Sequence, residues 1–253
     1  MAPAPSRRWI IWKGYGLAIL LLGAGAPVTA HEPVLLDPHR ATPGARLELE
    51  AVPAPVQGGD TPVYRLVAAG LPSGVVFNVW TKRFGHAFHE EARGFRVDGS
   101  GKLVSIQRGG ADAPRYLDQM VFQPEAYPRG AIWEVALASA DLTITAFAKV
   151  IPRPIVARDG ACEVSLKLVS HRGERFLVSG SGFAPGDVVI VESRYLGRVN
   201  QKERRASAAG LLPAEVISHA ALGDDRSARY SVKGRYCEVA VEYEWGEPAL
   251  GGR

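Results

Sequence analysis

Tyr64–Val79 reads YRLVAAGLPSGVVFNV, and Phe176–Val191 reads FLVSGSGFAPGDVVIV. When Gly70 is aligned with Gly182, the second glycine of each stretch and the flanking apolar residues coincide without a gap. Each copy is an apolar alternation, a Gly-apolar-x-x-Gly turn that carries a proline, and a second alternation. Strict alternation is typical of a half-buried β-strand. The pattern therefore predicts two strands joined by one kind of turn, used twice.

The turn glycines are expected to have a structural role. Gly70, Gly74, Gly182 and Gly186 occupy equivalent places. A turn between two strands needs a positive φ at some position, which a β-carbon resists. We interpret each turn as a hairpin or as a corner between two sheets.

Further matches extend the repeat along the chain. They are, in order, Gly101 with Gly210, Trp133–Val135 with Tyr230–Val232, and Leu142–Ile144 with Val239–Val241. Matches that keep their order indicate duplication of one unit. Gly and Pro are abundant, apolar runs are short, and each unit has about seven short strands, as an immunoglobulin-like sandwich does. The predicted fold is all-β, with two tandem immunoglobulin-like β-sandwiches after an N-terminal signal peptide.

The expected boundaries follow from the repeat. Residues 31–150 form the first immunoglobulin-like domain and residues 156–253 the second. Between them, residues 151–155 read IPRPI. Two prolines in three positions keep such a linker extended and fairly stiff.

The second copy of the turn resembles a known motif. Residues 182–187 read Gly-Phe-Ala-Pro-Gly-Asp, similar to the Gly-Phe-x-Pro-Gly-Glu turn of bacterial immunoglobulin-like and transcription-factor-like (IPT/TIG) domains. Residues 70–74 carry the looser form Gly-Leu-Pro-Ser-Gly. The resemblance covers about fifteen residues per unit. It implies extracytoplasmic spacers or binding modules that have no chemistry of their own.

Residues 1–30 have the features of a secretory signal peptide. A basic start is followed by an apolar run at 15–22 and by small residues at Val28 and Ala30. Cleavage after Ala30 is expected to direct the chain to the periplasm or the medium. The alternative is an uncleaved anchor, although the run is shorter than the ~20 residues of a span. No later apolar run is long enough, so we expect no membrane span after cleavage.

The basic character of the chain comes from the same segment. The whole chain has 30 Lys+Arg and 26 Asp+Glu. Residues 1–30 hold three of the cations and none of the anions, which leaves 27 against 26 in the remaining 223 residues. Without a basic excess or a basic stripe, nucleic acid is not an expected partner.

Two cysteines, Cys162 and Cys237, lie near the two ends of the second unit. In an exported chain such a pair most simply forms one disulfide. A metal or redox pair is the alternative, but there is no Cys-x-x-Cys and no histidine close in sequence.

Histidines suggest an alternative function, in copper binding. A mature N-terminal His31 would offer an α-amine and an imidazole, and His39, His86 or His89 could complete a nitrogen-rich site of the kind Cu(II) prefers. The other interpretation is that these are polar loop histidines. In the preferred interpretation we expect no cofactor.

Residues 80–96 form the least generic stretch of the chain, because aromatic and basic side chains are interleaved there. The candidate binding residues, in what we take to be a loop, are Trp80, Arg83, Phe84, His86, Phe88, His89 and Arg93. Aromatic rings beside cations can form a platform for a sugar or a peptide. The competing interpretation places Trp80, Phe95 and Trp133 in the core, as inward strand residues.

Catalysis finds little support in the sequence. Ser179–Gly182 has a superficial likeness to a nucleophile elbow, but it lies before a strand-to-strand turn rather than a strand-to-helix turn. The adjacent acidic pair Glu90–Glu91 reads as a solvated surface, and no phosphate-binding glycine loop is present. The sequence predicts no enzyme. It predicts an exported, non-catalytic binding or structural protein whose partner is an envelope protein or a glycan.

Overall fold

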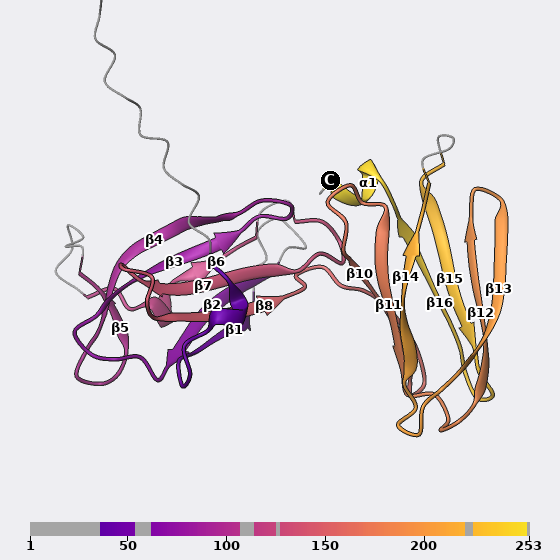
Figure 1. The fold of residues 1–253 in the computed structure, drawn as a ribbon, viewed down its shortest axis with the longest axis horizontal. Helices are drawn as coiled ribbons and strands as arrows, with labels where there is room; N and C mark the ends of the chain where they lie inside the picture. The colour runs from indigo at the N-terminus through magenta and orange to yellow at the C-terminus, as the bar shows by residue number, and fades with distance from the viewer. Residues whose placement is uncertain (1–35, 54–61, 107–113, 125–126, 221–224, 252–253) are drawn as a thin grey trace, which may run out of the picture. The chain divides into compact units, whose positions relative to one another are not determined.

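The computed structural model describes residues 36–53, 62–106, 114–124, 127–220 and 225–251. The predicted all-β fold is confirmed, because sixteen strands make up almost all of the regular structure in these residues (Figure 1). The predicted signal peptide and His31 lie outside the described residues. No helix in the described part is long and apolar enough to cross a membrane.

Strands β1 to β8 form two sheets, which we call the first sheet pair. Their bounds are β1 Arg46–Val52, β2 Val63–Ala69, β3 Val76–Lys82, β4 Phe88–Val97, β5 Leu103–Ser105, β6 Val121–Phe122, β7 Trp133–Ser139 and β8 Thr145–Val150, with 3-10 helices η1 Pro38–Arg40 and η2 Leu117–Gln119. One sheet has the order β1-β2-β6, and the other has the order β5-β4-β3-β7-β8. Both sheets contribute to one apolar core, in which the rings of Tyr64 and Trp133 lie 5.6 Å apart. This is a β-sandwich-like arrangement.

Strands β9 to β16 form the second sheet pair. Their bounds are β9 Ile155–Asp159, β10 Cys162–Leu168, β11 Arg175–Ser181, β12 Val188–Tyr195, β13 Arg198–Arg205, β14 Leu212–Ser218, β15 Ser227–Lys233 and β16 Glu238–Glu244, followed by α1 Glu247–Leu250. The sheets have the orders β14-β11-β10-β9 and β13-β12-β15-β16. Across the core, the ring of Phe176 on β11 meets that of Tyr243 on β16 at 5.0 Å.

The strand order repeats between the two sheet pairs. The order β1-β2-β6 corresponds to β10-β11-β14, and the order β4-β3-β7-β8 corresponds to β13-β12-β15-β16. In each pair the chain passes from one sheet to the other at the same place, between β2 and β3 in the first pair and between β11 and β12 in the second. The first sheet pair adds β5 at one edge, and the second adds β9.

The repeated turn is a corner between two sheets and not a hairpin, because β2 and β3, like β11 and β12, belong to different sheets. Its glycines have positive φ: 71° at Gly70, 80° at Gly74, 77° at Gly182 and 73° at Gly186. An L-residue rarely adopts such a conformation, which gives a physical reason for glycine at all four positions.

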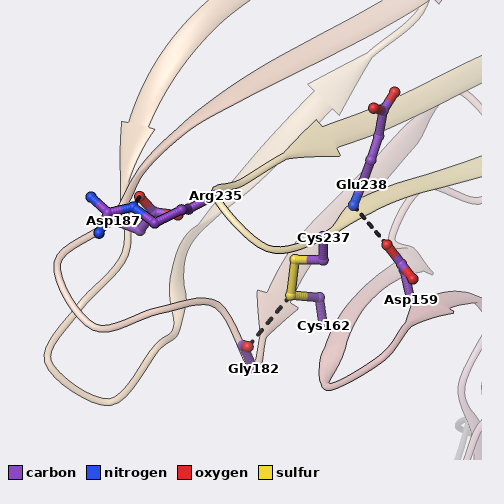
Figure 2. The surroundings of a disulfide bond; sticks show 7 residues. All are labelled: Asp159, Cys162, Gly182, Asp187, Arg235, Cys237 and Glu238. Carbon is purple, nitrogen blue, oxygen red and sulfur yellow. Dashed lines mark hydrogen bonds and ion pairs between the residues drawn. A yellow bond between two sulfur atoms is a disulfide. The ribbon is translucent and has the colours of Figure 1, made fainter.

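The predicted disulfide between Cys162 and Cys237 is confirmed, with their Cα atoms 6.4 Å apart. It joins the start of β10 to the residue before β16, and so connects the two sheets of the second pair (Figure 2). Beside it, the buried Asp187 of the corner turn accepts a hydrogen bond from the Arg235 backbone N at 2.8 Å. The geometry of this end therefore rests on a covalent bond and on a buried carboxylate.

Candidate functional site

The stretch predicted to be a binding loop is a β-hairpin. β3 ends at Lys82, a short turn follows, and β4 begins at Phe88. Lys82 pairs with Phe88, and Trp80 pairs with Glu90. The prediction of a loop was wrong, because the aromatic residues alternate with polar ones in a way that suits a strand with one face toward solvent.

Trp80 lies on the outer face of the five-stranded sheet, so the competing interpretation, in which it points inward to the core, was wrong for this residue. Its neighbours on β3, Val79 and Thr81, are buried on the opposite face. Phe95 and Trp133, by contrast, do lie in the core. The alternation of β3 was recognised from the sequence, but its phase relative to the core was not.

A small apolar cluster covers this outer face, and we call it the outer cluster. Leu36, Ala136 and Ala138 are buried in it, and Trp80, Phe88 and Phe147 pack against them partly buried. The rings of Phe88 and Phe147 meet edge to face at 6.1 Å. The Trp80 indole N–H is buried and has no hydrogen-bond partner among the described residues.

Charged side chains surround the outer cluster. Lys82 Nζ lies 2.6 Å from Glu134 Oε2 and 5.5 Å from the centre of the Phe88 ring. Glu90 accepts hydrogen bonds from the Asn78 amide at 3.0 Å and pairs with Arg93 at 2.7 Å. Such a surface can contact a partner in two ways, through the apolar faces of the rings and through the charged side chains around them.

The remaining candidate residues do not join the outer cluster. Arg83 and His86 are exposed in the hairpin turn. Phe84 packs against the ring of Tyr127, with 6.5 Å between centroids. Tyr127 is buried, and its hydroxyl donates to the backbone oxygen of Ile132 at 2.6 Å, so this contact anchors the turn.

His89 takes part in a polar cluster on the inner side of the hairpin. Its Nε2 lies 3.1 Å from Thr81 Oγ1 and 3.4 Å from Glu91 Oε2. A catalytic triad needs the carboxylate on one ring nitrogen and the hydroxyl on the other. Here the same nitrogen faces both groups, and Thr81 is buried. The arrangement does not match a triad.

The copper alternative concerns His31, His39, His86 and His89. His31 lies outside the described residues. His39 is in η1, and its backbone N is bonded to Asp37. Within the described ranges, no group of three or more His, Cys, Asp or Glu side chains is placed to hold a metal ion. The structure adds no observation in favour of copper.

Sequence reasoning missed two polar sites in the second sheet pair, and the first is centred on Glu215. Its carboxylate accepts hydrogen bonds from Lys202 at 2.5 Å, Arg204 at 3.2 Å and the Tyr230 hydroxyl at 2.7 Å. Burial alone would raise the pKa of Glu215, but these donors outweigh it, and the pKa is lowered. The cluster links β13 to β14, the edge strands of two different sheets.

The second missed site is His219, which directly follows β14. It is 6% exposed, and its Nε2 lies 2.9 Å from the Tyr243 hydroxyl oxygen. Burial lowers its pKa to about 4, so the ring is neutral at pH 7. No sequence signal marks either residue, because both depend on which strands the fold brings together.

Comparisons with known proteins identify no family for this chain. No protein-family model matches it, and no curated protein does. Among solved structures, it is similar to a crystal structure of a tetra-tandem repeat in the extending region of a large adhesion protein. The TM-score is 0.27 at 11% identity, over 79% of this chain and 48% of that one. The chain thus spans about half the length of that structure, and a similarity this low carries no argument about function.

Proposed function

We propose that this chain is an exported, non-catalytic binding or structural protein of the cell envelope or the extracellular space. Its two units are immunoglobulin-like domains, residues 31–150 and 156–253, joined by the linker 151–155, after a signal peptide at 1–30. The repeated strand order supports this organisation. The disulfide supports export, since such bonds persist in oxidising compartments.

The observation that carries a binding role is the difference between equivalent outer faces of the two sheet pairs. The strand register makes Trp80, Ala136 and Phe147 equivalent to Glu192, Ser231 and Ala240. The outer cluster is therefore a property of one unit and not of the fold. A polar outer face, as in the second sheet pair, is what solubility in water favours. The aromatic residues on the outer face of the first sheet pair therefore indicate a binding role.

The contact surface we propose is the outer cluster with the hairpin turn and rim beside it. Arg83, His86 and Arg93 are its exposed polar residues. Aromatic and arginine side chains are the residue types that contribute most to binding interfaces. The partner is a component of the cell envelope, either a protein or a glycan.

Co-sedimentation with isolated cell envelopes tests this function. The mature protein is expected to pellet with envelopes, and the double variant Arg83→Ala, Arg93→Ala to pellet less. The matched control is Arg194→Ala, Arg229→Ala, which removes two exposed arginines from the second sheet pair. Equal loss in both double variants, or no binding by the wild type, would contradict the proposal. Protease treatment of the envelopes then separates a protein partner from a glycan.

Export is tested by the intact mass of the protein recovered outside the cytoplasm. A chain that begins at His31 and is lighter by two hydrogens than its reduced form is expected. A chain that retains residues 1–30, or one with free thiols, would contradict this part of the proposal.

A further inference from the structure

His219 lies at the end of the second sheet pair that is opposite the disulfide. It follows the last residue of β14, whereas the disulfide end carries the corner turn that precedes β12. Strands of seven or eight residues separate the two ends by roughly 23 Å. The helix α1 lies at the same end of this sheet pair, because it follows β16 and because the Gly246 N before it donates to the Gly173 oxygen in the turn before β11 (Figure 1).

Four aromatic rings enclose His219. Tyr195 on β12 is the nearest at 4.8 Å, followed by Trp245 at 5.2 Å, Tyr243 on β16 at 5.7 Å and Phe176 on β11 at 6.3 Å. Both sheets therefore contribute to one cage around a titratable ring. The imidazole is held at the place where the two sheets meet.

This cage leaves polar atoms without partners. The Nδ1 of His219, the indole N–H of Trp245 and one guanidinium nitrogen of Arg226 are buried and have no hydrogen-bond partner among the described residues. An unsatisfied buried polar atom lowers the stability of its surroundings. Among the described residues, this end of the second sheet pair therefore has more buried polar atoms without a hydrogen-bond partner than the disulfide end.

The charged and titratable groups around His219 do not stabilise a positive charge on its ring. Tyr243 and Tyr195 face the ring, and burial raises the pKa of Tyr243, so its hydroxyl stays protonated. The Arg226 guanidinium stacks on the other aromatic neighbour, Trp245, at 4.7 Å. Within the described residues, no carboxylate oxygen is paired with a ring nitrogen of His219. A charged imidazole would therefore share the Trp245 indole as a neighbour with the Arg226 cation.

The segment that closes this end is the C-terminal part of the described chain. Trp245 is fully buried, its backbone N donates to the Arg226 oxygen at 2.9 Å, and the Gly246 N donates to the Gly173 oxygen at 2.7 Å. Ala249 of α1 is also buried. This closing segment, residues 245–250, is held by the Trp245 indole, by Ala249 and Leu250 against the core, and by a few backbone bonds, with no disulfide.

We propose that His219 is an acid-sensitive latch, whose protonation releases the closing segment 245–250 and opens this end of the second sheet pair, while the disulfide keeps the other end closed. The latch concerns the stability of one end of the molecule and does not depend on the binding role proposed above.

The direction of the pH effect follows from the lowered pKa. Because an exposed imidazole titrates near 6.5 and the buried one near 4, the open form binds the proton more readily. The contribution of neutral His219 to the stability of the closed form is complete above pH 6.5 and decreases as the pH falls toward 4. Below pH 4 it no longer changes. Across this window the ratio of closed to open forms is expected to fall by about 300-fold, the ratio of the two acid constants.

Amide hydrogen exchange of the full mature chain tests the latch. It is measured at pH 7 and at pH 4.5, with labelling times scaled for the intrinsic pH dependence of exchange. Peptides that cover residues 240–251 and 219–220 are expected to lose protection at pH 4.5, whereas those around Cys162 and Cys237 keep it. Loss of protection at both ends together, or at neither, would overturn the proposal.

Two variants make the test specific. His219→Gln keeps a polar group beside Tyr243 but does not titrate, so its protection should no longer depend on pH. His171→Gln removes an exposed histidine from the same sheet pair and should behave as the wild type. An unchanged pH response in His219→Gln would overturn the latch. If that variant does not fold, an NMR titration of His219 in the wild type decides, since a pKa at or above 6.5 would overturn it as well.

Discussion

A β-carbon on Gly182 would overlap the backbone carbonyl oxygen of Ala161, which lies in the turn before β10. In the first sheet pair, a β-carbon on Gly70 would overlap the carbonyl oxygen of Gly44 in the same way. Both corners thus place a glycine directly against the turn that precedes the partner strand. The second glycine of each corner, Gly74 or Gly186, has open space around it.

The two glycines of a corner should therefore differ in their tolerance of alanine. Gly186→Ala has only the cost of a positive φ, about 1 kcal/mol. Gly182→Ala must also displace a strand turn, and we expect a loss of at least about 3 kcal/mol. Urea denaturation of the two variants measures the difference, and Gly74→Ala and Gly70→Ala provide the matched pair in the first unit. Equal losses at Gly182 and Gly186 would show that the chain relaxes around the added methyl group.

The disulfide is expected to stabilise the second sheet pair selectively. Cys162 and Cys237 are 75 residues apart, and closing such a loop contributes about 4 kcal/mol in the chain-entropy model. Replacing both cysteines by alanine should lower the unfolding free energy of that pair by about this amount. Hydrogen exchange in β2, β3 and β7 should stay unchanged. A reducing agent should then have no further effect on the double variant, which serves as the control for the reduction experiment.

Glu215 gives a prediction for acid pH that is distinct from that for His219. Its pKa is lowered, so its contribution to stability is complete above its usual value of 4.5 and is lost as the pH falls below it. Glu215→Gln should cost about 2 kcal/mol at pH 7, because the acceptor that Lys202 and Arg204 share loses its negative charge. The gap between variant and wild type should narrow below pH 4.5.

The control for this measurement is Glu242→Gln. Glu242 is exposed and lies 3.4 Å from Arg229, so its replacement should change the unfolding free energy by less than about 0.5 kcal/mol. A gap between Glu215→Gln and wild type that is independent of pH would mean that packing, and not charge, is what the carboxylate contributes.

Much of the fold could be predicted from local pattern, because the corner turn is a local motif with its own chemistry. The outer position of Trp80 could not be predicted. Alternation divides the residues of a strand between two faces, but it does not say which face lies against the core. The match of Tyr230 with Trp133 was wrong by two residues: the register of β7 and β15 makes Tyr230 equivalent to Val135. A slip of two residues keeps every side chain on its own face, so alternation cannot detect it.

The candidate site was harder to predict than the fold for a related reason. Glu215 lies on β14 and His219 directly follows it, but their partners come from β11, β12, β13, β15 and β16. Such contacts depend on the sheet order and not on spacing along the chain. The candidate binding residues of the stretch 80–96, which are close in sequence and were predicted to form a loop, were brought together only in part.

The corrected register shows what replaces the disulfide in the first unit. Leu49 pairs with Leu66 as Leu166 pairs with Val178, which makes Ala45 equivalent to Cys162. Counting back three residues along each chain from the equivalent pair Phe147 and Ala240 makes Ile144 equivalent to Cys237, so the match of Ile144 with Val241 was wrong by four residues. The loop bonds agree, because the Ser139 N donates to the Ile144 oxygen just as the Gly234 N donates to the Cys237 oxygen.

Ala45 and Ile144 should therefore accept an engineered disulfide. Both pack against the core partly buried, as Cys237 does, whereas Cys162 is buried. In the variant Ala45→Cys, Ile144→Cys, a second bridge should form on oxidation and make the protein lighter by two hydrogens. It should stabilise the first sheet pair by about 4 kcal/mol, less the loss of the isoleucine side chain. The single variant Ala45→Cys measures the effect of an added thiol alone. Free thiols that persist under oxidation would show that the two ends of the repeat are not geometrically equivalent, and that the first unit is held by packing which the disulfide geometry cannot replace.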